Sequence, residues 1–127
     1  MDEQEKEFLS LLGYFYLRNH KIDKAGILFR ALLELYPNDA YLQRALAYTY
    51  LQQGKFEQCL LMADRFLDNP GSGSGKTEAF FIKSKALWGL GREDSARAML
   101  NRYIEERQIT DGVEPEPNTQ AEEVSYE

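Results

Sequence analysis

The sequence predicts an all-α fold, in which three helix-turn-helix repeats stack into a short right-handed solenoid with a concave groove. The main observation is a period of 34 residues, since residues 12–16 (Leu-Gly-Tyr-Phe-Tyr) recur as residues 46–50 (Leu-Ala-Tyr-Thr-Tyr), and Ala25 recurs as Cys59. A third copy follows after three extra residues and contains Ser84, Leu87, Gly91 and Ala96. Repeats of this length bury their apolar faces only by stacking on their neighbours. We therefore expect an extended binding surface.

The periodicity of apolar residues and the turn signals place six helices, at about residues 3–19, 23–36, 39–53, 56–67, 77–90 and 93–107. In the first helix, one apolar stripe is expected to comprise Phe8, Leu9, Leu12, Phe15 and Tyr16. Pro37 ends the second helix, and Asn38 is expected to cap the third. Gly54 and Gly91 supply permissive turns, and Thr77 is a candidate N-cap for the fifth helix.

Two segments outside the helices have compositions that disfavour packing. Residues 69–75 (Asn-Pro-Gly-Ser-Gly-Ser-Gly) combine small side chains with a backbone that is not stiff, so we expect a flexible connector there. Residues 111–127 contain six acids, no Lys or Arg and few bulky apolar residues, so we expect a disordered acidic tail. The repeat domain is then residues 1–110, with repeats at about 6–39, 40–73 and 77–110.

The formal net charge of −6 belongs to this tail, because the first 110 residues contain 15 acids and 15 bases. A formally neutral domain lacks the basic stripe that nucleic-acid binding needs. The single cysteine excludes a disulfide framework. The N-terminus has no basic-then-apolar leader, and no apolar run approaches the length of a membrane span. We therefore expect a protein of the cytoplasm that binds neither nucleic acid nor the membrane interior.

The chain lacks the residue sets that catalysis or metal binding requires. Residues 70–77 (Pro-Gly-Ser-Gly-Ser-Gly-Lys-Thr) resemble a phosphate-binding loop, but Pro70 stands where the first glycine is needed, and a helical pattern precedes it. Cys59 is expected to be a small buried residue where two helices touch. His20, the only histidine, has no second ligand at metal-binding spacing. We expect no enzymatic activity, no cofactor and no metal.

The repeats resemble the tetratricopeptide repeat. In the first, the matching residues are Leu12, Gly13, Tyr16, Ala25, Phe29 and Pro37. In the second, they are Leu46, Ala47, Tyr50, Gly54 and Cys59. In the third, they are Phe80, Ser84, Gly91 and Ala96, while Lys83 stands at a position that is usually apolar. The resemblance implies that the small residues let paired helices touch and that the large ones fill the space between pairs.

A narrower resemblance comes from residues 7–16 and 24–37, which are similar to the small chaperones of bacterial type III secretion, most of all the YscY (SctY) type. The similarity covers residues 5–108. It implies a chaperone of the bacterial cytoplasm, with a small secreted client of the YscX (SctX) type and docking on the export-gate protein SctV. A translocator chaperone of the SycD type is the alternative within the family, and a generic assembly scaffold is the alternative outside it.

The tetratricopeptide resemblance also implies which residues line the concave groove, namely Leu11, Tyr14, Leu17, Arg18, Tyr41, Arg44, Ala45, Tyr48, Leu51, Phe81, Ile82, Lys85 and Trp88. Core positions are already filled by other residues, such as Tyr16 and Tyr50, so the groove aromatics are not needed for packing within the stack. An aromatic groove is suited to a peptide or helix. A C-terminal helix that folds back, or a second copy of the chain, would also cover these residues, so a homodimer without client stays open.

Overall fold

The computed structural model describes residues 1–111, so the expected tail lies outside the described residues except for Asp111. The described part contains α1 (Glu3–Arg18), α2 (Ile22–Leu35), α3 (Ala40–Gln52), α4 (Phe56–Leu67), a short 3₁₀ helix η1 (Gly73–Gly75), α5 (Lys76–Gly89) and α6 (Glu93–Asp111). The all-α prediction is confirmed. The bounds of α4 agree with the expected ones, whereas α6 extends four residues beyond position 107.

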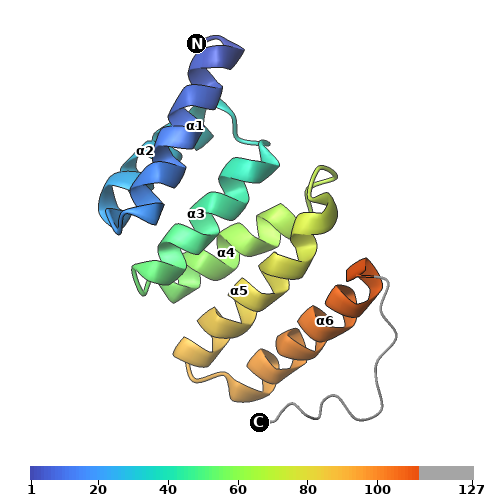
Figure 1. The fold of residues 1–127 in the computed structure, drawn as a ribbon. Coiled ribbons are helices and arrows are strands. Elements are labelled where there is room, and N and C mark those ends of the chain that lie inside the picture. The colour runs from blue at the N-terminus through green and yellow to red at the C-terminus, as the bar shows by residue number, and fades with distance from the viewer. Residues whose placement is uncertain (112–127) are drawn as a thin grey trace.

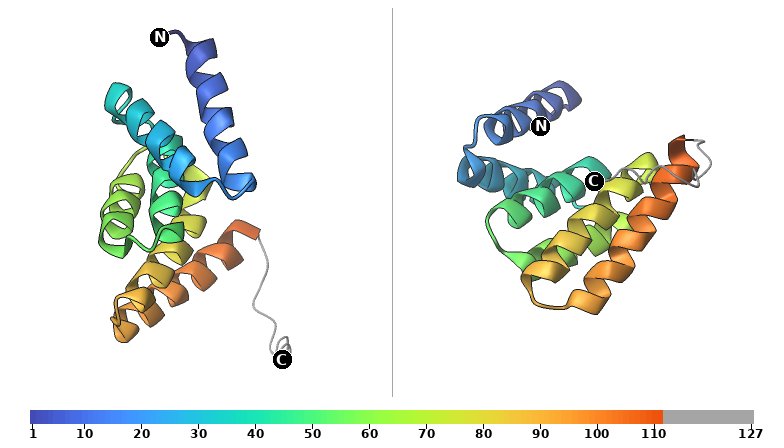
Figure 2. Two further views of the ribbon diagram at one scale, coloured as in Figure 1. Left: turned by 90° about the vertical axis from the view of Figure 1, so that its left-hand side faces the viewer. Right: turned by 60° about the horizontal axis from the view of Figure 1, so that its bottom comes forward.

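The helices form three antiparallel hairpins that stack side by side (Figure 1). Each helix packs on the next, and α1 also contacts α3 while α3 contacts α5. The first helices of the three hairpins therefore form one continuous layer. The two further views in Figure 2 show the same stack with α1 and α6 at its opposite ends. This is the architecture of a tetratricopeptide-like helical solenoid.

Side-chain caps fix where two of the helices begin. Asp2 accepts a hydrogen bond from the Glu5 amide at 2.8 Å, and the Glu5 carboxylate accepts one from the Asp2 amide at 3.2 Å, which is a capping box. Asp39 accepts from the Leu42 amide at 2.9 Å, so Asp39 caps α3 and the expectation of Asn38 was wrong. Thr77 lies inside α5 and is not its N-cap.

The turn between the two helices is the same in all three hairpins. The left-handed residue is His20 (φ 61°), Gly54 (φ 74°) and Gly91 (φ 79°), respectively. The backbone N–H after each turn residue donates to a carbonyl five positions earlier, at 2.8–2.9 Å: Lys21 to Tyr16, Lys55 to Tyr50, and Arg92 to Leu87. The repeat in the sequence is therefore also a repeat in backbone geometry, with His20 as its one non-glycine member.

Small residues lie where paired helices touch. The equivalent positions Gly13 and Ala25, Ala47 and Cys59, and Ser84 and Ala96 are all buried. A Cβ atom at Gly13 would lie 2.6 Å from two carbons of the buried Phe29 ring, closer than van der Waals contact allows. The large residues of the core include Phe29, Leu32, Leu42 and Leu46, which are all almost fully buried.

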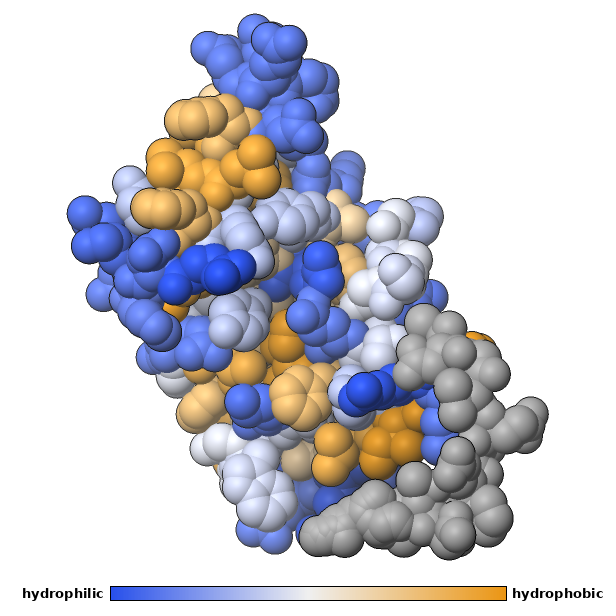
Figure 3. All heavy atoms as spheres, in the orientation of Figure 1, coloured by the Kyte–Doolittle hydropathy of each residue, from blue (hydrophilic) through white to orange (hydrophobic). Residues whose placement is uncertain are grey.

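The apolar stripe expected on α1 is only partly buried. Leu9 and Tyr16 pack against the core, but Phe8 and Phe15 are 64% and 55% exposed. In a solenoid, this face of the first helix would be covered by a preceding repeat, and none precedes it in the described residues. Together with exposed Leu11, these two rings form an apolar surface that we name the α1 patch; Figure 3 shows apolar residues gathered over α1.

Residues 69–75 form a packed turn rather than the flexible connector that their composition predicts. The Asn69 side chain accepts from the Gly71 amide and donates to the Asn38 carbonyl, each at 2.8 Å. A Cβ atom at Gly75 would lie 2.8 Å from the buried Phe66 ring. Glycine is therefore used here for close approach to a ring, and the turn fixes the third hairpin against the second.

Lys83, which replaces an apolar residue in the third repeat, is accommodated by an ion pair. Its ammonium lies 2.7 Å from the Asp64 carboxylate, so the charge reaches the surface between α5 and α4. Its side chain is 19% exposed, so its aliphatic stem is largely buried while its charged end meets a partner.

Candidate functional site

Three neighbouring hollows follow the layer formed by α1, α3 and α5. The central hollow has a volume of about 400 Å³ and lies between α1, α3 and α5. It is lined by Tyr14, Leu17, Arg18, Tyr41, Arg44, Ala45, Tyr48 and Glu78. Seven of these eight residues are among those that the sequence placed in the groove. Burial raises the pKa of the Tyr41 hydroxyl, which reflects the partly buried position of this ring.

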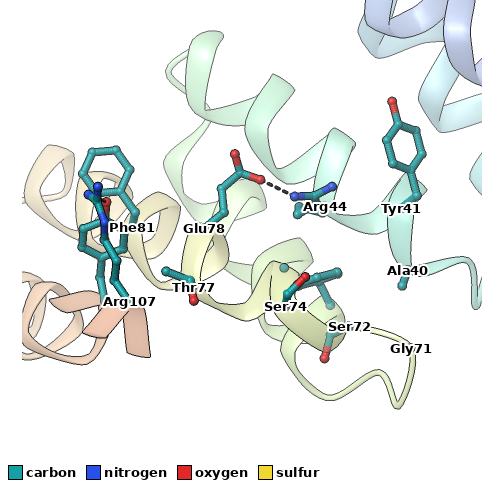
Figure 4. A pocket seen from close by; sticks show the side chains of 13 residues that line it. Ala40, Tyr41, Arg44, Gly71, Ser72, Ser74, Thr77, Glu78, Phe81 and Arg107 are labelled. Carbon is teal, nitrogen blue, oxygen red and sulfur yellow. Dashed lines mark hydrogen bonds and ion pairs between the residues drawn. The ribbon is translucent and has the colours of Figure 1, made fainter. Parts of the chain in front are cut away.

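The second hollow, the turn hollow, is the largest of the three, with a volume of about 660 Å³ (Figure 4). It shares Tyr41, Arg44 and Glu78 with the central hollow, and it extends over the 71–75 turn toward α6. Arg44 and Glu78 point toward each other across it and form an ion pair. Two residues of α6, Tyr103 and Arg107, complete its wall.

The third hollow, the Trp88 hollow, has a volume of about 270 Å³ and lies between α5 and α6. It is lined by Phe81, Ser84, Lys85, Trp88, Ala96, Arg97 and Leu100. Phe81 also lines the turn hollow, so the three hollows share residues from one end to the other. We refer to the three together as the groove.

The groove aromatics are separate from the aromatics of the core. Tyr48 is 39% exposed, whereas Tyr50, two residues later on α3, packs against the core cluster. Trp88 is 58% exposed, and Tyr14, Tyr41 and Phe81 are also open to solvent. A row of exposed rings costs free energy in water, and it is typical of surfaces that another chain covers.

Three residues that the sequence placed in the groove lie elsewhere. Ile82 is only 2% exposed and belongs to the core cluster, so its assignment to the groove was wrong. Adjacent residues of a helix point about 100° apart, which is why Phe81 faces the groove while Ile82 faces inward. Leu51 is partly buried against the core, and Leu11 belongs to the α1 patch.

The sequence analysis missed the contribution of α6 to the groove. Tyr103 packs on Phe81 with ring centroids 5.1 Å apart, and Leu100 reaches the Trp88 hollow. The resemblance to the repeat family assigns the groove to the first helix of each pair only. The last described pair is not followed by another helix in residues 1–111, so its second helix borders the groove as well.

The described residues offer neither a reactive thiol nor a cluster of metal-binding side chains. Burial raises the pKa of the Cys59 thiol to about 12, which makes it a poor nucleophile at neutral pH. In residues 1–111, no three His, Cys, Asp or Glu side chains lie close enough together to hold a metal ion. None of the helices described is long and apolar enough to cross a membrane.

Comparison with known families places a tetratricopeptide repeat match at residues 28–60. The match begins within α2 and ends within α4, so it spans the junction between the first two hairpins. No curated protein matches the chain. The match supports a tetratricopeptide-repeat protein, and repeats of this kind typically act as non-catalytic scaffolds in protein–protein interaction.

Proposed function

We propose that this chain is a chaperone of bacterial type III secretion, of the SctY (YscY) type, that acts in the cytoplasm. Its client is a small secreted protein of the SctX (YscX) type, and the pair docks on the export-gate protein SctV. The observation that carries the proposal is the groove, in which Tyr14, Tyr41, Tyr48, Phe81 and Trp88 are exposed although the core is complete without them. The similarity of residues 7–16 and 24–37 to this chaperone family supplies the client class.

The proposed mechanism is burial of an apolar client segment in the groove. A ring that a client fully covers removes roughly 150–250 Å² from water, and each such burial contributes to affinity. The same contact shields the client's apolar segment from other chains in the cytoplasm. The hollows are open and follow one another along the helix layer, which suits an extended peptide or one helix lying in a groove.

We propose a homodimer in the absence of client, formed through the α1 patch. Phe8, Leu11 and Phe15 lie at helical spacings of three and four residues on one exposed face. The first turn of α1 is acidic and its last turn carries Arg18. Two copies of α1 packed antiparallel would therefore bury the three apolar residues and place opposite charges near each other. This contact leaves most of the groove available to the client.

The experiment that tests the function is affinity purification of the full chain from its native organism, followed by mass spectrometry of the bound proteins. Recovery of the SctX-type protein, and of SctV when that client is present, is the expected result. Recovery of translocator proteins instead would favour a SycD-type chaperone. Recovery of components unrelated to secretion would favour a generic assembly scaffold, and either result would contradict the proposed client.

A further inference from the structure

The groove pairs an aromatic ring with a basic residue four positions later on three different helices. On α1, the Arg18 guanidinium lies 5.8 Å from the centre of the Tyr14 ring. On α5, the Lys85 ammonium lies 5.6 Å from the Phe81 ring, and on α6 the Arg107 guanidinium lies 6.0 Å from the Tyr103 ring. Because residues four apart share a helix face, each base is held beside its ring at the groove.

Hydrogen bonds hold two of these bases in place. Arg18 donates to the Tyr14 hydroxyl at 3.2 Å, and Arg107 donates to the Tyr103 hydroxyl at 2.9 Å. The Tyr14 contact uses one N–H of the Arg18 guanidinium, and a guanidinium has five. The groove therefore offers cationic donors immediately beside apolar surface. A bound segment that carries a carboxylate next to an apolar residue would be complementary to it.

The charge of the groove is opposite to that of the rest of the molecule. Among the residues that the structure describes, five basic side chains line the three hollows, namely Arg18, Arg44, Lys85, Arg97 and Arg107, together with one acidic side chain, Glu78. Glu78 is itself paired with Arg44. The first 110 residues contain equal numbers of acids and bases, so the concentration of bases in the groove is a local feature and does not follow from composition.

Aromatic rings with bases also occur where proteins bind single-stranded nucleic acid. Such sites combine stacking rings with a basic channel that neutralises several successive phosphates. Here Arg44 and Arg97 already have carboxylate partners, Glu78 and Asp94, so fewer cations of the groove can face the successive phosphates of a nucleic acid. A peptide with only a few carboxylates needs fewer cations, so the observations favour a protein segment.

We infer that the groove takes an amphipathic helical segment whose polar side is acidic. Its apolar residues lie on Tyr48, Phe81 and Trp88, and its carboxylates meet Arg18 and Lys85. This inference rests on the proposed function and adds the charge of the client segment to it. It also implies that clients lacking acidic residues beside their apolar positions are excluded, because they would leave bases covered and unpaired.

The test uses the full chain and two synthetic amphipathic peptides of about 15 residues, roughly four helical turns. Both carry the same leucines at helical spacing, and their polar positions are glutamate in one and lysine in the other. Trp88 is the only tryptophan and lies in the groove, so its emission reports binding directly. We expect the glutamate peptide to bind about tenfold more tightly or better, equivalent to about 1.4 kcal/mol, at about 50 mM salt. The preference should shrink at about 500 mM salt.

Paired variants test whether these bases set the preference. Arg18→Glu with Lys85→Glu should favour the lysine peptide, and Arg18→Gln with Lys85→Gln should abolish the preference without inverting it. Arg30→Glu with Lys55→Glu changes two exposed bases that line none of the three hollows and should leave it intact. Circular dichroism checks that each variant is folded.

Four outcomes would overturn the inference, and they separate it from the proposed function. Equal binding of the two peptides would remove the charge preference while the groove stands as a binding site. No change of Trp88 emission with either peptide would count against the groove itself. Tighter binding of an oligothymidylate than of the glutamate peptide would assign the groove to nucleic acid. A change of emission on dilution without peptide would assign it to a second copy of this chain.

Discussion

His20 occupies the same left-handed turn position in the first hairpin as Gly54 does in the second. Their φ angles are 61° and 74°, and the residue after each donates an equivalent backbone hydrogen bond. A residue with a Cβ atom is strained in this region of backbone space, whereas glycine is not. The first turn therefore has the same left-handed conformation as the other two, although His20 is less suited to it than glycine.

The prediction from this relationship is that His20→Gly stabilises the protein. Relief of the strained φ should exceed the added entropy of the unfolded chain and raise stability by about 0.5–1 kcal/mol. For a domain of this size, the thermal midpoint should rise by roughly 2–6 °C. Gly54→Ala, which introduces the same strain into the second turn, should lower the midpoint. A lower midpoint for His20→Gly would show that the imidazole makes a stabilising contact that outweighs the strain.

Burial of the Cys59 thiol should make the stability of the protein decrease at alkaline pH. Burial raises its folded pKa to about 12, against about 8.5 in an unfolded chain. The contribution of the buried thiol to the free energy of unfolding is therefore fully present below about pH 8.5. It declines by up to about 1.4 kcal/mol per pH unit as the pH rises toward 12. Urea unfolding from pH 7 to 10 should show a steeper decline for the wild type than for Cys59→Ala. Parallel profiles for the two proteins would mean that the thiol is not buried in the folded state.

Substitutions in the turn at residues 71–75 and next to it should differ in their effect on stability. Gly75→Ala introduces a Cβ atom 2.8 Å from the Phe66 ring, so it should cost about 1–3 kcal/mol, the usual range for overpacking. Lys76→Ala, the adjacent change at an exposed side chain, should leave the thermal midpoint within about a degree. Equal midpoints for the two variants would support the flexible connector that the composition predicts.

The α1 patch predicts self-association of the protein without client. Sedimentation equilibrium should show a dimer for the wild type and a monomer for Phe15→Glu, because burying an unpaired carboxylate in an apolar contact is unfavourable. Leu61→Glu, at a 66% exposed apolar residue of α4, is the matched control and should leave the dimer intact. A wild-type protein that is monomeric at high concentration, or a dimer in Phe15→Glu, would contradict the dimer proposed through this patch.

The helix pairs could be predicted from the sequence because the repeat is encoded locally. Small residues such as Gly13, Ala47 and Ser84 recur where paired helices touch, and the turn residues recur between them. The side of α5 that faces the core was harder to predict, because Phe81 and Ile82 are adjacent and both apolar. Which of the two faces inward depends on how α5 packs on α4, and that packing includes the Lys83–Asp64 ion pair and the packed turn before α5.

The exposure of side chains at the two ends of the stack could also not be predicted from the residue pattern. Phe8 and Phe15 follow the period of a buried stripe, but burial requires a neighbour that residues 1–111 do not supply. At the other end, Tyr103 of α6 borders the groove, and no further helix of residues 1–111 follows α6. In both cases the residue type and spacing were visible in the sequence, while whether another helix of residues 1–111 covers them depends on how the helices stack.

The central claim is that the groove binds the client, and the pair Tyr48 and Tyr50 tests it most directly. Tyr48 is exposed in the central hollow, while Tyr50 packs against the core from the same helix. We predict that Tyr48→Ala keeps the circular dichroism spectrum and thermal midpoint, and that it weakens the complex with the SctX-type client at least about tenfold. Tyr50→Ala should lower the thermal midpoint first. The account would be contradicted if folded Tyr48→Ala bound the client with wild-type affinity, or if Tyr48→Ala unfolded the domain.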